Sequence, residues 1–382
     1  MTGSYKHLFR RSLEAAPDRL HFAAHSHHLW PDASYEGQIA AWNDAARLAD
    51  RKWGRVMEEV WPAAQRHVAH EIGVPDPSTI VFAGNTHDFL IRVASAMENR
   101  PIRILTTDGE FHSFSRQVAR WEEAGSVTVD RIAVGEELAD RLIEQAKLNA
   151  YDLIFVSQVM FGSGAVTHGL ERLAALAGPA GPWVVIDGYH GFMATDTDLS
   201  AFADRVFYLA GGYKYAMAGE GVAVMHAPPG YGMRPELTGW YAAFEDLAAP
   251  PGTVGYAPDA RRFMGATFDP SGLYRFVAVR DMLAKEALTT ARISEHCNGL
   301  KQQLLAGRSA TPLAQARLLN PPAAGPQARF LAFRTPDAMV LHAALSVRGV
   351  MTDVRGDVLR IGFGLYQDEA DVTALLNALR TL

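Results

Sequence analysis

The sequence is poor in cysteine, because its 382 residues include only Cys297. One thiol cannot form a disulfide within the chain, and it cannot supply a zinc site built on paired cysteines. Cys297 also lies in a stretch whose apolar residues recur at helical steps, whereas a nucleophilic thiol needs a partly exposed, electropositive position. We therefore expect no thiol chemistry, and the composition is consistent with a reducing compartment.

Long apolar runs and blocks of one charge are missing as well. No apolar run reaches the about 18 residues of a membrane-spanning helix, and the N-terminal residues lack the pattern of a signal peptide. The 36 Lys and Arg residues against 42 Asp and Glu residues give a net charge of −6, without a long basic segment that would attract nucleic acid. We expect a cytoplasmic protein whose partner is a small molecule rather than a membrane or a nucleic acid.

Apolar residues, by contrast, are plentiful. With 48% hydrophobic and 20% charged residues, the chain can bury a sizeable core in one or two domains. Short, nearly continuous apolar runs alternate with segments of helical spacing, a pattern typical of strands covered on both faces. This predicts an α/β fold with a mainly parallel central sheet. The predicted strands are 79–82, 102–106, 127–134, 153–157, 183–187, 206–210 and 222–226.

Other segments flank this sheet. Residues 34–72 have helical spacing that Pro62 is expected to interrupt or restart, and stretches rich in proline and glycine at 228–230 and 249–252 indicate a boundary or an active-site loop. Beyond them the pattern predicts a smaller α+β arrangement. Its elements are a long helix over 273–307, strands at 330–334 and 358–362, and helices at 337–348 and 368–379. We predict an N-terminal arm and helix that packs on the small domain (1–60), a large α/β domain (61–252) and a small C-terminal α+β domain (253–382).

Two polar residues follow neighbouring predicted strands. Asp187 ends the strand 183–187, at the edge of the sheet where ligands of open α/β folds bind, although it could simply cap the following turn. Lys214 follows the next strand, within the apolar and glycine-rich segment Gly211–Tyr215. Burial lowers the pKa of a lysine and makes its amine nucleophilic. This pair meets the needs of pyridoxal phosphate (PLP), which takes a covalent anchor and an anion opposite its pyridinium nitrogen.

A phosphate site and a stacking residue are predicted at the same edge. In Phe82–Thr86, a strand ends in Gly-Asn-Thr at the start of a helix, where free N–H groups and the helix dipole favour an anion. Phe111, just beyond the strand 102–106, offers an aromatic face to a flat ring. Each signal is weak by itself, because most such turns are ordinary caps and most such phenylalanines are core residues.

Together these segments resemble the class V, fold-type I family of PLP-dependent enzymes, and within it most closely the kynureninases. The resemblance extends over essentially the whole chain. Its motifs are His21–Pro31, the phosphate turn, Phe111, Ser157–Gly164, the Asp-x-x-His pattern of Asp187–His190, Tyr213-Lys214-Tyr215 and the arginine segment Gly356–Tyr366.

The resemblance implies a role for each matching residue at the cofactor. Lys214 would be the Schiff-base lysine and proton shuttle, Asp187 would face the pyridinium nitrogen, and His190 would support the ring. Phe111 would stack on that ring. The phosphate would be held by Gly84, Asn85, Thr86 and Tyr213, and Trp240 and Thr267 complete the expected cofactor contacts.

Substrate contacts and a partner are implied as well. Arg360 would bind the α-carboxylate of an amino acid as a bidentate pair, and His25 and His27 would contact the substrate. Because Gly239-Trp240-Tyr241 resembles the family segment that reaches into the other subunit, a homodimer with the active site at its interface is expected.

The implied reaction is hydrolytic cleavage of the Cβ–Cγ bond of a γ-keto amino acid, with Tyr213 or one of the N-terminal histidines as candidate base for the water. The chain departs from the kynureninase pattern at His25, at His27-His28 and at Met264–Pro270, which stands in place of an Asn-Pro-Pro turn. The alternative is a class V aminotransferase or β-lyase on the same scaffold.

The histidines at 25, 27 and 28 permit a minor alternative, a metal-dependent hydrolase, since imidazoles two residues apart on a strand face the same way and suit zinc or iron. No further ligand motif accompanies them, so the PLP interpretation, with no metal, is preferred. A non-catalytic binding module of the same fold is disfavoured by the joint presence of Asp187, Lys214 and Arg360.

Overall fold

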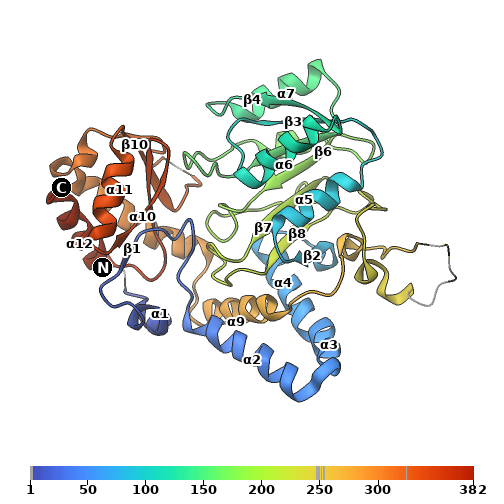
Figure 1. Ribbon diagram of the computed structural model, residues 1–382, viewed down its shortest axis with the longest axis horizontal. Helices are drawn as coiled ribbons and strands as arrows, with labels where there is room; N and C mark the ends of the chain where they lie inside the picture. Colours follow the sequence, from blue (N-terminus) through green and yellow to red (C-terminus); the bar gives the residue numbers. More distant parts are fainter. Residues whose placement is uncertain (1–2, 247–249, 251, 253, 324) are drawn as a thin grey trace.

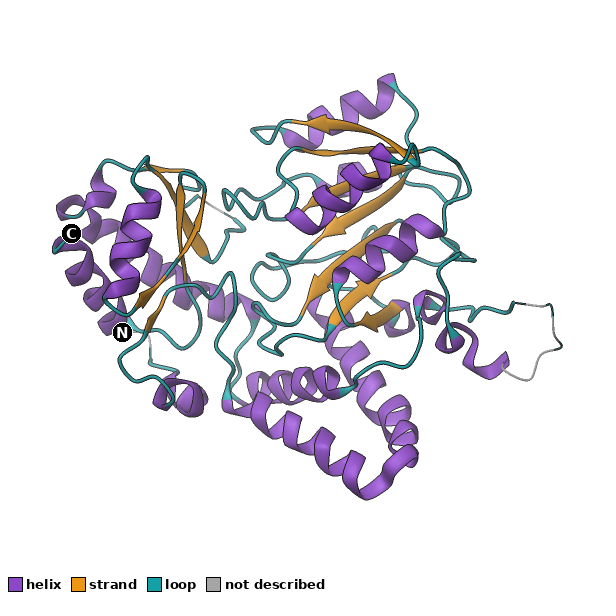
Figure 2. Cartoon of the chain, in the orientation of Figure 1, coloured by secondary structure: helices purple, strands orange, loops and turns teal. Residues whose placement is uncertain are grey.

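The computed structural model describes residues 3–246, 250, 252, 254–323 and 325–382. The stretch at 249–252 and the predicted domain boundary at 252–253 therefore lie partly outside the described residues. Figure 1 shows two bodies of secondary structure, each built on a sheet, with both chain ends in the smaller one. Figure 2 separates these strand layers from the helices around them.

The larger sheet has seven strands within the described residues, in the order β2-β8-β7-β6-β5-β3-β4. The pairings from β4 to β7 are parallel, whereas β8 runs antiparallel to β7 and to β2. This confirms a mainly parallel central sheet. Its strands are β2 (Ile80–Ala83), β3 (Ile102–Thr107), β4 (Val127–Ile132), β5 (Leu153–Ser157), β6 (Trp183–Asp187), β7 (Val206–Gly211) and β8 (Ala223–His226).

Helices connect the strands of the larger sheet. Asn85 begins the first of them by accepting a hydrogen bond from the Asp88 N–H at 2.9 Å. Figure 1 shows α5 and α6 lying against the sheet. These helices are α5 (Thr86–Ser95), α6 (His112–Glu123), α7 (Leu138–Leu148) and α8 (Leu170–Ala174).

A smaller antiparallel sheet, in the order β12-β13-β10-β9, forms the second body among the described residues. A separate parallel pair, β1 with β11, joins the N-terminal segment to it. The strands are β1 (Leu20–His21), β9 (Arg317–Leu318), β10 (Phe330–Arg334), β11 (Val350–Met351), β12 (Asp353–Arg355) and β13 (Val358–Gly362). The helices are α10 (Thr290–Gly307), α11 (Ala338–Val347) and α12 (Glu369–Arg380).

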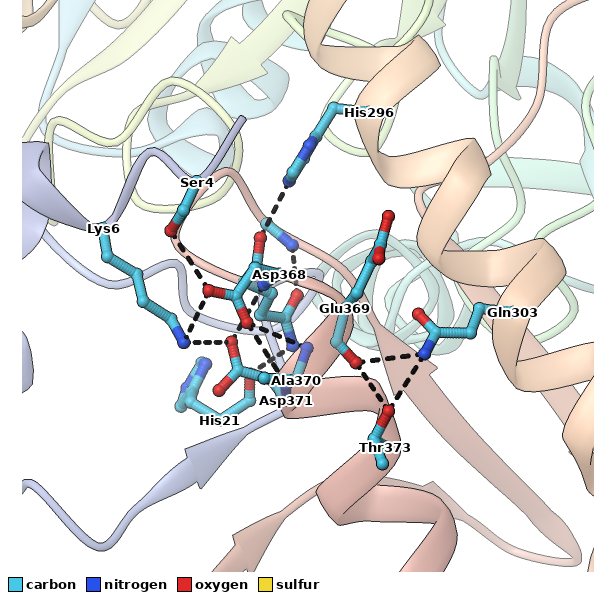
Figure 3. A network of polar contacts seen from close by, with 12 residues as sticks. Ser4, Lys6, His21, His296, Gln303, Asp368, Glu369, Ala370, Asp371 and Thr373 are labelled. Carbon is cyan, nitrogen blue, oxygen red and sulfur yellow. Dashed lines mark hydrogen bonds and ion pairs between the residues drawn. The ribbon is translucent and has the colours of Figure 1, made fainter. Parts of the chain in front are cut away.

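Charged side chains attach the start of the chain to α12. Lys6 Nζ lies 3.0 Å from Asp368 and 2.9 Å from Asp371, and Ser4 donates to Asp368 (Figure 3). Asp368 and Asp371 also form the capping box of α12, so the same two carboxylates begin the helix and hold the N-terminal segment.

Two packed helices lie at the bottom of Figure 1, below the larger sheet: α2 (Asp32–Leu48) runs along α9 (Ser271–Lys285). Pro62 lies in the first turn of α4, where the N-terminal helical region changes from the π-helical turn η3 (Val56–Val60) to an α-helix. The backbone stays helical through Val60 (φ −71°, ψ −47°), so the region is broken instead at Ala49, whose φ is 51°. The elements leading to α4 are η1 (Lys6–Phe9), α1 (Arg10–Glu14), η2 (Ala49–Arg51), α3 (Lys52–Arg55), the π-helical turn η3 (Val56–Val60) and α4 (Trp61–Glu71). The remaining short turns are η4 (Pro77–Thr79), η5 (Trp240–Asp246), η6 (Ala260–Phe263), η7 (Arg308–Ala310) and η8 (Pro312–Ala314).

The predicted long helix over 273–307 is wrong. The chain forms α9 and α10 with a break between them, because Ala287 takes a left-handed conformation (φ 52°) and Thr289 caps α10 through the Arg292 N–H. The domain division at 253 stays a prediction, although α9, which follows it, packs on α2 and α4. No helix of the described residues is long and apolar enough to cross a membrane.

The crossing of α2 and α9 depends on a glycine. A Cβ atom at Gly37 would lie 2.6 Å from the Tyr274 carbonyl oxygen, so we expect Gly37→Ala to lower the free energy of unfolding by about 1–3 kcal/mol. Gly54→Ala in α3 is the control, because nothing lies within 4 Å of its added methyl group. It should raise that free energy by up to about 1 kcal/mol. Urea denaturation followed by circular dichroism measures both, and equal effects would contradict the close approach.

Candidate active site

A cavity of about 990 Å³ lies at the carboxyl ends of β5, β6 and β7, beside the first residues of α5 and α6. Parallel strands bring their carboxyl ends to one edge, so the polar residues that end them meet there. Ser157 at the end of β5, Asp187 at the end of β6 and Lys214 in the loop after β7 line the cavity, and Asn85 and Thr86 line it from the start of α5.

Lys214 is buried in this cavity. Its Nζ lies 2.6 Å from His190 Nε2 and within 4.5, 5.5 and 5.9 Å of the ring centres of Tyr189, Phe111 and Tyr213. Burial lowers the pKa of Lys214 to about 7, an effect that the negative charge of Asp187 opposes. The amine is therefore able to lose its proton near neutral pH and act as a nucleophile or base.

Asp187 and His190 are titratable neighbours of Lys214. Asp187 Oδ1 accepts a hydrogen bond from the Tyr189 N–H at 2.9 Å, and burial raises the pKa of this carboxyl group. Burial and the nearby Lys214 lower the pKa of His190 well below its usual value, so its ring is neutral. Within the described residues, the buried Nδ1 of His190 has no hydrogen-bond partner. A buried polar atom of this kind is expected to meet a ligand or water.

Two tyrosine rings pack so closely on the strand ends of the site that only glycine fits beneath them. A Cβ atom on Gly211 would overlap the ring of Tyr189, and one on Gly188 would overlap the ring of Tyr208. Each tyrosine thus covers a glycine of the neighbouring strand end, and the two strand ends interlock. The glycines of Asp187–Tyr189 and Gly211–Lys214 allow this packing, which brings the Tyr189 ring to Lys214.

The N-terminus of α5 opens on the cavity, where a phosphate site is predicted. The Asn85 side chain caps the helix, and Thr86 at the first helical position lines the cavity. The unpaired N–H groups of the first turn and the helix dipole favour a phosphate or carboxylate there. Gly84, predicted as a third member of this site, does not line the cavity.

Arg360 lies on β13, outside the cavity lining and buried. Its Nη2 lies 2.9 Å from Asp353 Oδ2, its Nη1 donates to the Phe161 carbonyl oxygen at 2.5 Å, and its Nε has no partner within the described residues. Phe161 itself lines the cavity, so the guanidinium group lies directly behind that wall. The free Nε edge leaves capacity for a carboxylate.

The three N-terminal histidines have different surroundings. His25 is fully buried and stacks on Phe330 with ring centres 4.7 Å apart, and neither ring nitrogen has a partner in the described part of the chain. His27 is exposed, stacks on Tyr213 and lies 3.5 Å from Glu220, whereas the Nδ1 of His28 lies 2.7 Å from the Leu29 carbonyl oxygen. No cluster of three potential metal ligands occurs among the described residues.

The cavity brings together most, but not all, of the predicted site residues. Trp240 lies away from it in η5 with 41% of its surface exposed, so its predicted contact with a second subunit, like the homodimer, stays a prediction. The predicted residues in the lining are Asn85, Thr86, Phe111, Asp187, His190, Tyr213 and Lys214, whereas Gly84, Trp240, Thr267, His25, His27 and Arg360 are not in it.

No role is predicted from the sequence for Tyr189, Ser157 or Asp353, although Tyr189 and Ser157 lie within matching motifs. Ser157 ends β5 as Asp187 ends β6, and the two are register partners, so the strand-end rule that selected Asp187 also applies to Ser157. Asp353 is the register partner of Arg360, a relation that no spacing in the sequence reveals.

Comparison with protein-family models gives a match that covers most of the chain. The model of the family "Aminotransferase class-V" matches residues 40–375. Comparison with curated protein sequences gives no significant match.

Solved structures of the same fold include a cysteine desulfurase from Thermococcus onnurineus NA1, with 18% identity, a TM-score of 0.81 and coverage of 100% of this chain and 98% of that one. Two structures of C-DES also match with TM-scores of 0.81. One is the K223A variant with glycine covalently linked to its PLP cofactor, at 17% identity, covering 97% and 98% of the two chains. The other, the cystine C–S lyase with its product cysteine persulfide, has 18% identity and covers 96% and 99%. The chain has the fold-type I architecture of PLP-dependent enzymes.

The residues of the cavity fit PLP. Lys214 offers an amine that burial can deprotonate, Asp187 offers a carboxylate at the same strand edge, and the first turn of α5 offers donors for a phosphate. Phe111 also lines the cavity, with its ring centre 5.5 Å from Lys214 Nζ. The cofactor would be held by these groups, and the partnerless Nδ1 of His190 is a donor or acceptor still available to it.

The lowered pKa of Lys214 predicts the pH dependence of cofactor attachment. Because a lowered pKa releases the proton at lower pH, the rate at which PLP attaches covalently to the apoprotein should rise with a midpoint near 7 rather than near the usual 10.5. Stopped-flow absorbance measures this rate. Asp187→Asn removes the charge that raises the pKa and should move the midpoint lower, Lys214→Arg should abolish attachment, and a midpoint near 10 in the wild type would contradict the burial argument.

Proposed function

The chain belongs to the class-V aminotransferase family and is a PLP-dependent enzyme, and we propose that it is a lyase that breaks a bond at the β-carbon of an α-amino acid. The observation that carries this proposal is Lys214, whose Nζ lies 2.6 Å from a neutral His190 inside the cavity that Asp187 lines. An amine so placed can remove and return a proton at the α-carbon of a bound amino acid.

Bound PLP supplies the electron sink for carbanion chemistry at the α-carbon. Asp187 would keep the ring nitrogen protonated, because a carboxylate in a buried site strongly favours a cation beside it. Phe111 would fix the plane of the ring, and the start of α5 would hold the phosphate. Lys214 would carry the proton between the substrate and the site, with His190 Nε2 fixing the position of its Nζ.

Arg360 would bind the α-carboxylate of the substrate. The charge of the buried guanidinium group is compensated by Asp353, and its Nε has no acceptor among the residues that the structure describes. A guanidinium group recognises a carboxylate through two parallel hydrogen bonds, which also orient the substrate at Lys214. The substrate class is therefore an α-amino acid, and the proposed reaction requires a leaving group on its β-carbon.

Elimination at the β-carbon is favoured over persulfide formation on an enzyme thiol. The chain's single cysteine, Cys297, is fully buried in α10, and burial raises the pKa of its thiol. A buried, protonated thiol is a poor nucleophile. The fold is shared with cysteine desulfurases and with a cystine C–S lyase, and loss of a β-substituent is the part of such chemistry that needs no thiol of the enzyme.

Kynureninase-type hydrolysis of a γ-keto amino acid is a second candidate, supported by Tyr213. This phenol lines the cavity near Lys214, and burial raises its pKa, so it stays protonated and can donate to a carbonyl oxygen of the substrate. Both candidates begin with the same proton removal at the α-carbon and differ in the bond that breaks next.

Product analysis of the holoenzyme tests the proposal. Incubation with cystine or an S-substituted cysteine should release pyruvate and ammonia, and Lys214→Ala should abolish this release. If the enzyme forms anthranilate from kynurenine but no pyruvate from the sulfur amino acids, the lyase proposal is rejected in favour of the hydrolase. Keto acid that forms only when an amino-group acceptor is added would replace both by an aminotransferase.

The buried thiol predicts that cysteine is dispensable. Cys297→Ala should keep at least about half of the turnover number, because a thiol with no exposed surface cannot reach a substrate. Steady-state kinetics at saturating PLP measure this. If Cys297→Ala loses turnover but keeps its melting temperature and its bound cofactor, the reaction depends on the thiol and the prediction is wrong.

Arg360 and Arg355 both pair with Asp353, so substitutions at the two positions distinguish binding of the substrate carboxylate from a general effect of charge. Arg360→Lys should raise KM by about 10-fold or more, because a lysine loses the bidentate geometry. Arg355→Lys is the matched control: Arg355 pairs with the same carboxylate at 3.3 Å but is 44% exposed, and its replacement should leave KM nearly unchanged. Equal effects of the two substitutions would remove Arg360 from the substrate site.

A further inference from the structure

A buried carboxyl group that the proposed reaction does not use lies behind the cavity wall. Glu110, between β3 and α6, is 3% exposed. Its Oε1 accepts hydrogen bonds from Thr107 Oγ1 at 2.7 Å and from the Ser157 N–H at 3.2 Å, and its Oε2 accepts from Ser157 Oγ at 2.5 Å. Glu110 thus joins the ends of β3 and β5.

Ser157 connects this carboxyl group to the cavity. It ends β5, pairs in register with Asp187 of β6 and lines the cavity. A serine hydroxyl group has one hydrogen to donate and two lone pairs to accept with. Because Ser157 donates its hydrogen to Glu110, it can offer the cavity only lone pairs.

We propose that Glu110 is a positioning residue that fixes Ser157 as a hydrogen-bond acceptor toward a donor group of the bound cofactor or substrate, and that protonation of Glu110 reverses this polarity. When Oε2 carries a proton, that proton is donated to Ser157 Oγ, and the serine hydrogen turns toward the cavity. The proposal adds a proton-controlled contact to the site and does not depend on which bond of the substrate breaks.

The surroundings of Glu110 allow it to change protonation near neutral pH. Burial raises its pKa to about 7, the hydrogen bonds from Ser157 and Thr107 lower it, and the charge of Asp187 raises it again. Of the segments around it, β3 contributes Thr107, β5 contributes Ser157, and β6 contributes the carboxyl group of Asp187. At the start of α6, Ser115 Oγ donates to the Glu110 backbone carbonyl, and the ring of His112 packs on Phe161.

Glu110→Gln tests the proposal in the holoenzyme. The amide group accepts from Thr107 and the Ser157 N–H and donates to Ser157 Oγ, so it imitates the protonated carboxyl group at every pH. The absorption spectrum of bound PLP in the wild type should contain a pH-dependent component with a midpoint near 7. In Glu110→Gln this component should disappear, and the affinity for PLP above pH 8 should fall about fivefold, as expected for one neutral hydrogen bond.

Three further measurements keep the test decisive. Thr107→Val removes one hydrogen bond to the carboxylate and should move the midpoint upward, even if Glu110→Gln does not fold. Glu122→Gln, on the exposed face of α6, is the matched control and should change neither the midpoint of the spectrum nor the affinity for PLP. Infrared spectroscopy of the apoprotein should show a protonated carboxyl band that titrates with the same midpoint and is lost in Glu110→Gln.

The proposal fails if the infrared band is lost in Glu110→Gln while the pH profile of the cofactor spectrum stays that of the wild type. It also fails if Thr107→Val leaves the midpoint unchanged. Neither outcome affects the proposed lyase activity, which is judged by pyruvate release. Conversely, absence of pyruvate with an intact Glu110-dependent spectrum would reject the lyase and keep the role of Glu110.

Discussion

A buried amine is the feature on which the site depends. Lys214 has aromatic rings around it and a neutral histidine 2.6 Å away, and Asp187 is the carboxylate that opposes the loss of its proton. Burial alone would make the amine easy to deprotonate but also costly to keep charged. The nearby carboxylate balances that cost and leaves the amine able to take up and release a proton near pH 7. The proposed chemistry needs a group that can do both.

The larger sheet provides this environment through the parallel alignment of β5, β6 and β7. Their carboxyl ends meet at one edge, and the reciprocal packing of Tyr189 on Gly211 and Tyr208 on Gly188 locks two of these ends together. The same edge carries Ser157, so the carboxyl group of Asp187 lies in the cavity wall and that of Glu110 lies behind it. The charged groups at this edge lie close together because the strands are neighbours in the sheet, not because the residues are neighbours in the chain.

The smaller sheet contributes a charge of the opposite sign. Arg360 and Asp353 form a buried ion pair behind Phe161, which holds a guanidinium group close to the cavity before any substrate carboxylate arrives. A buried cation without such a partner would be strongly destabilising. Cys297 lies in the same body but is enclosed by α10 and its neighbours, so the only thiol of the chain is separated from the chemistry.

The sequence by itself determined the strands of the larger sheet and the residues that end them, because continuous apolar runs and the polar residue after each run are local signals. Asp187, Lys214 and the turn before α5 could be found in this way, and the resemblance of their order to class V enzymes extended the list to Arg360. Local signals did not show the break between α9 and α10, the antiparallel course of β8, or which histidines face the cavity. Those features depend on contacts between distant segments: His25 stacks on Phe330, Arg360 pairs with Asp353 across two strands, and Ser157 donates to Glu110 across the sheet edge. Only the tertiary structure decided them, because a side chain's partner, burial and pKa are set by what packs against it and not by its neighbours in the chain.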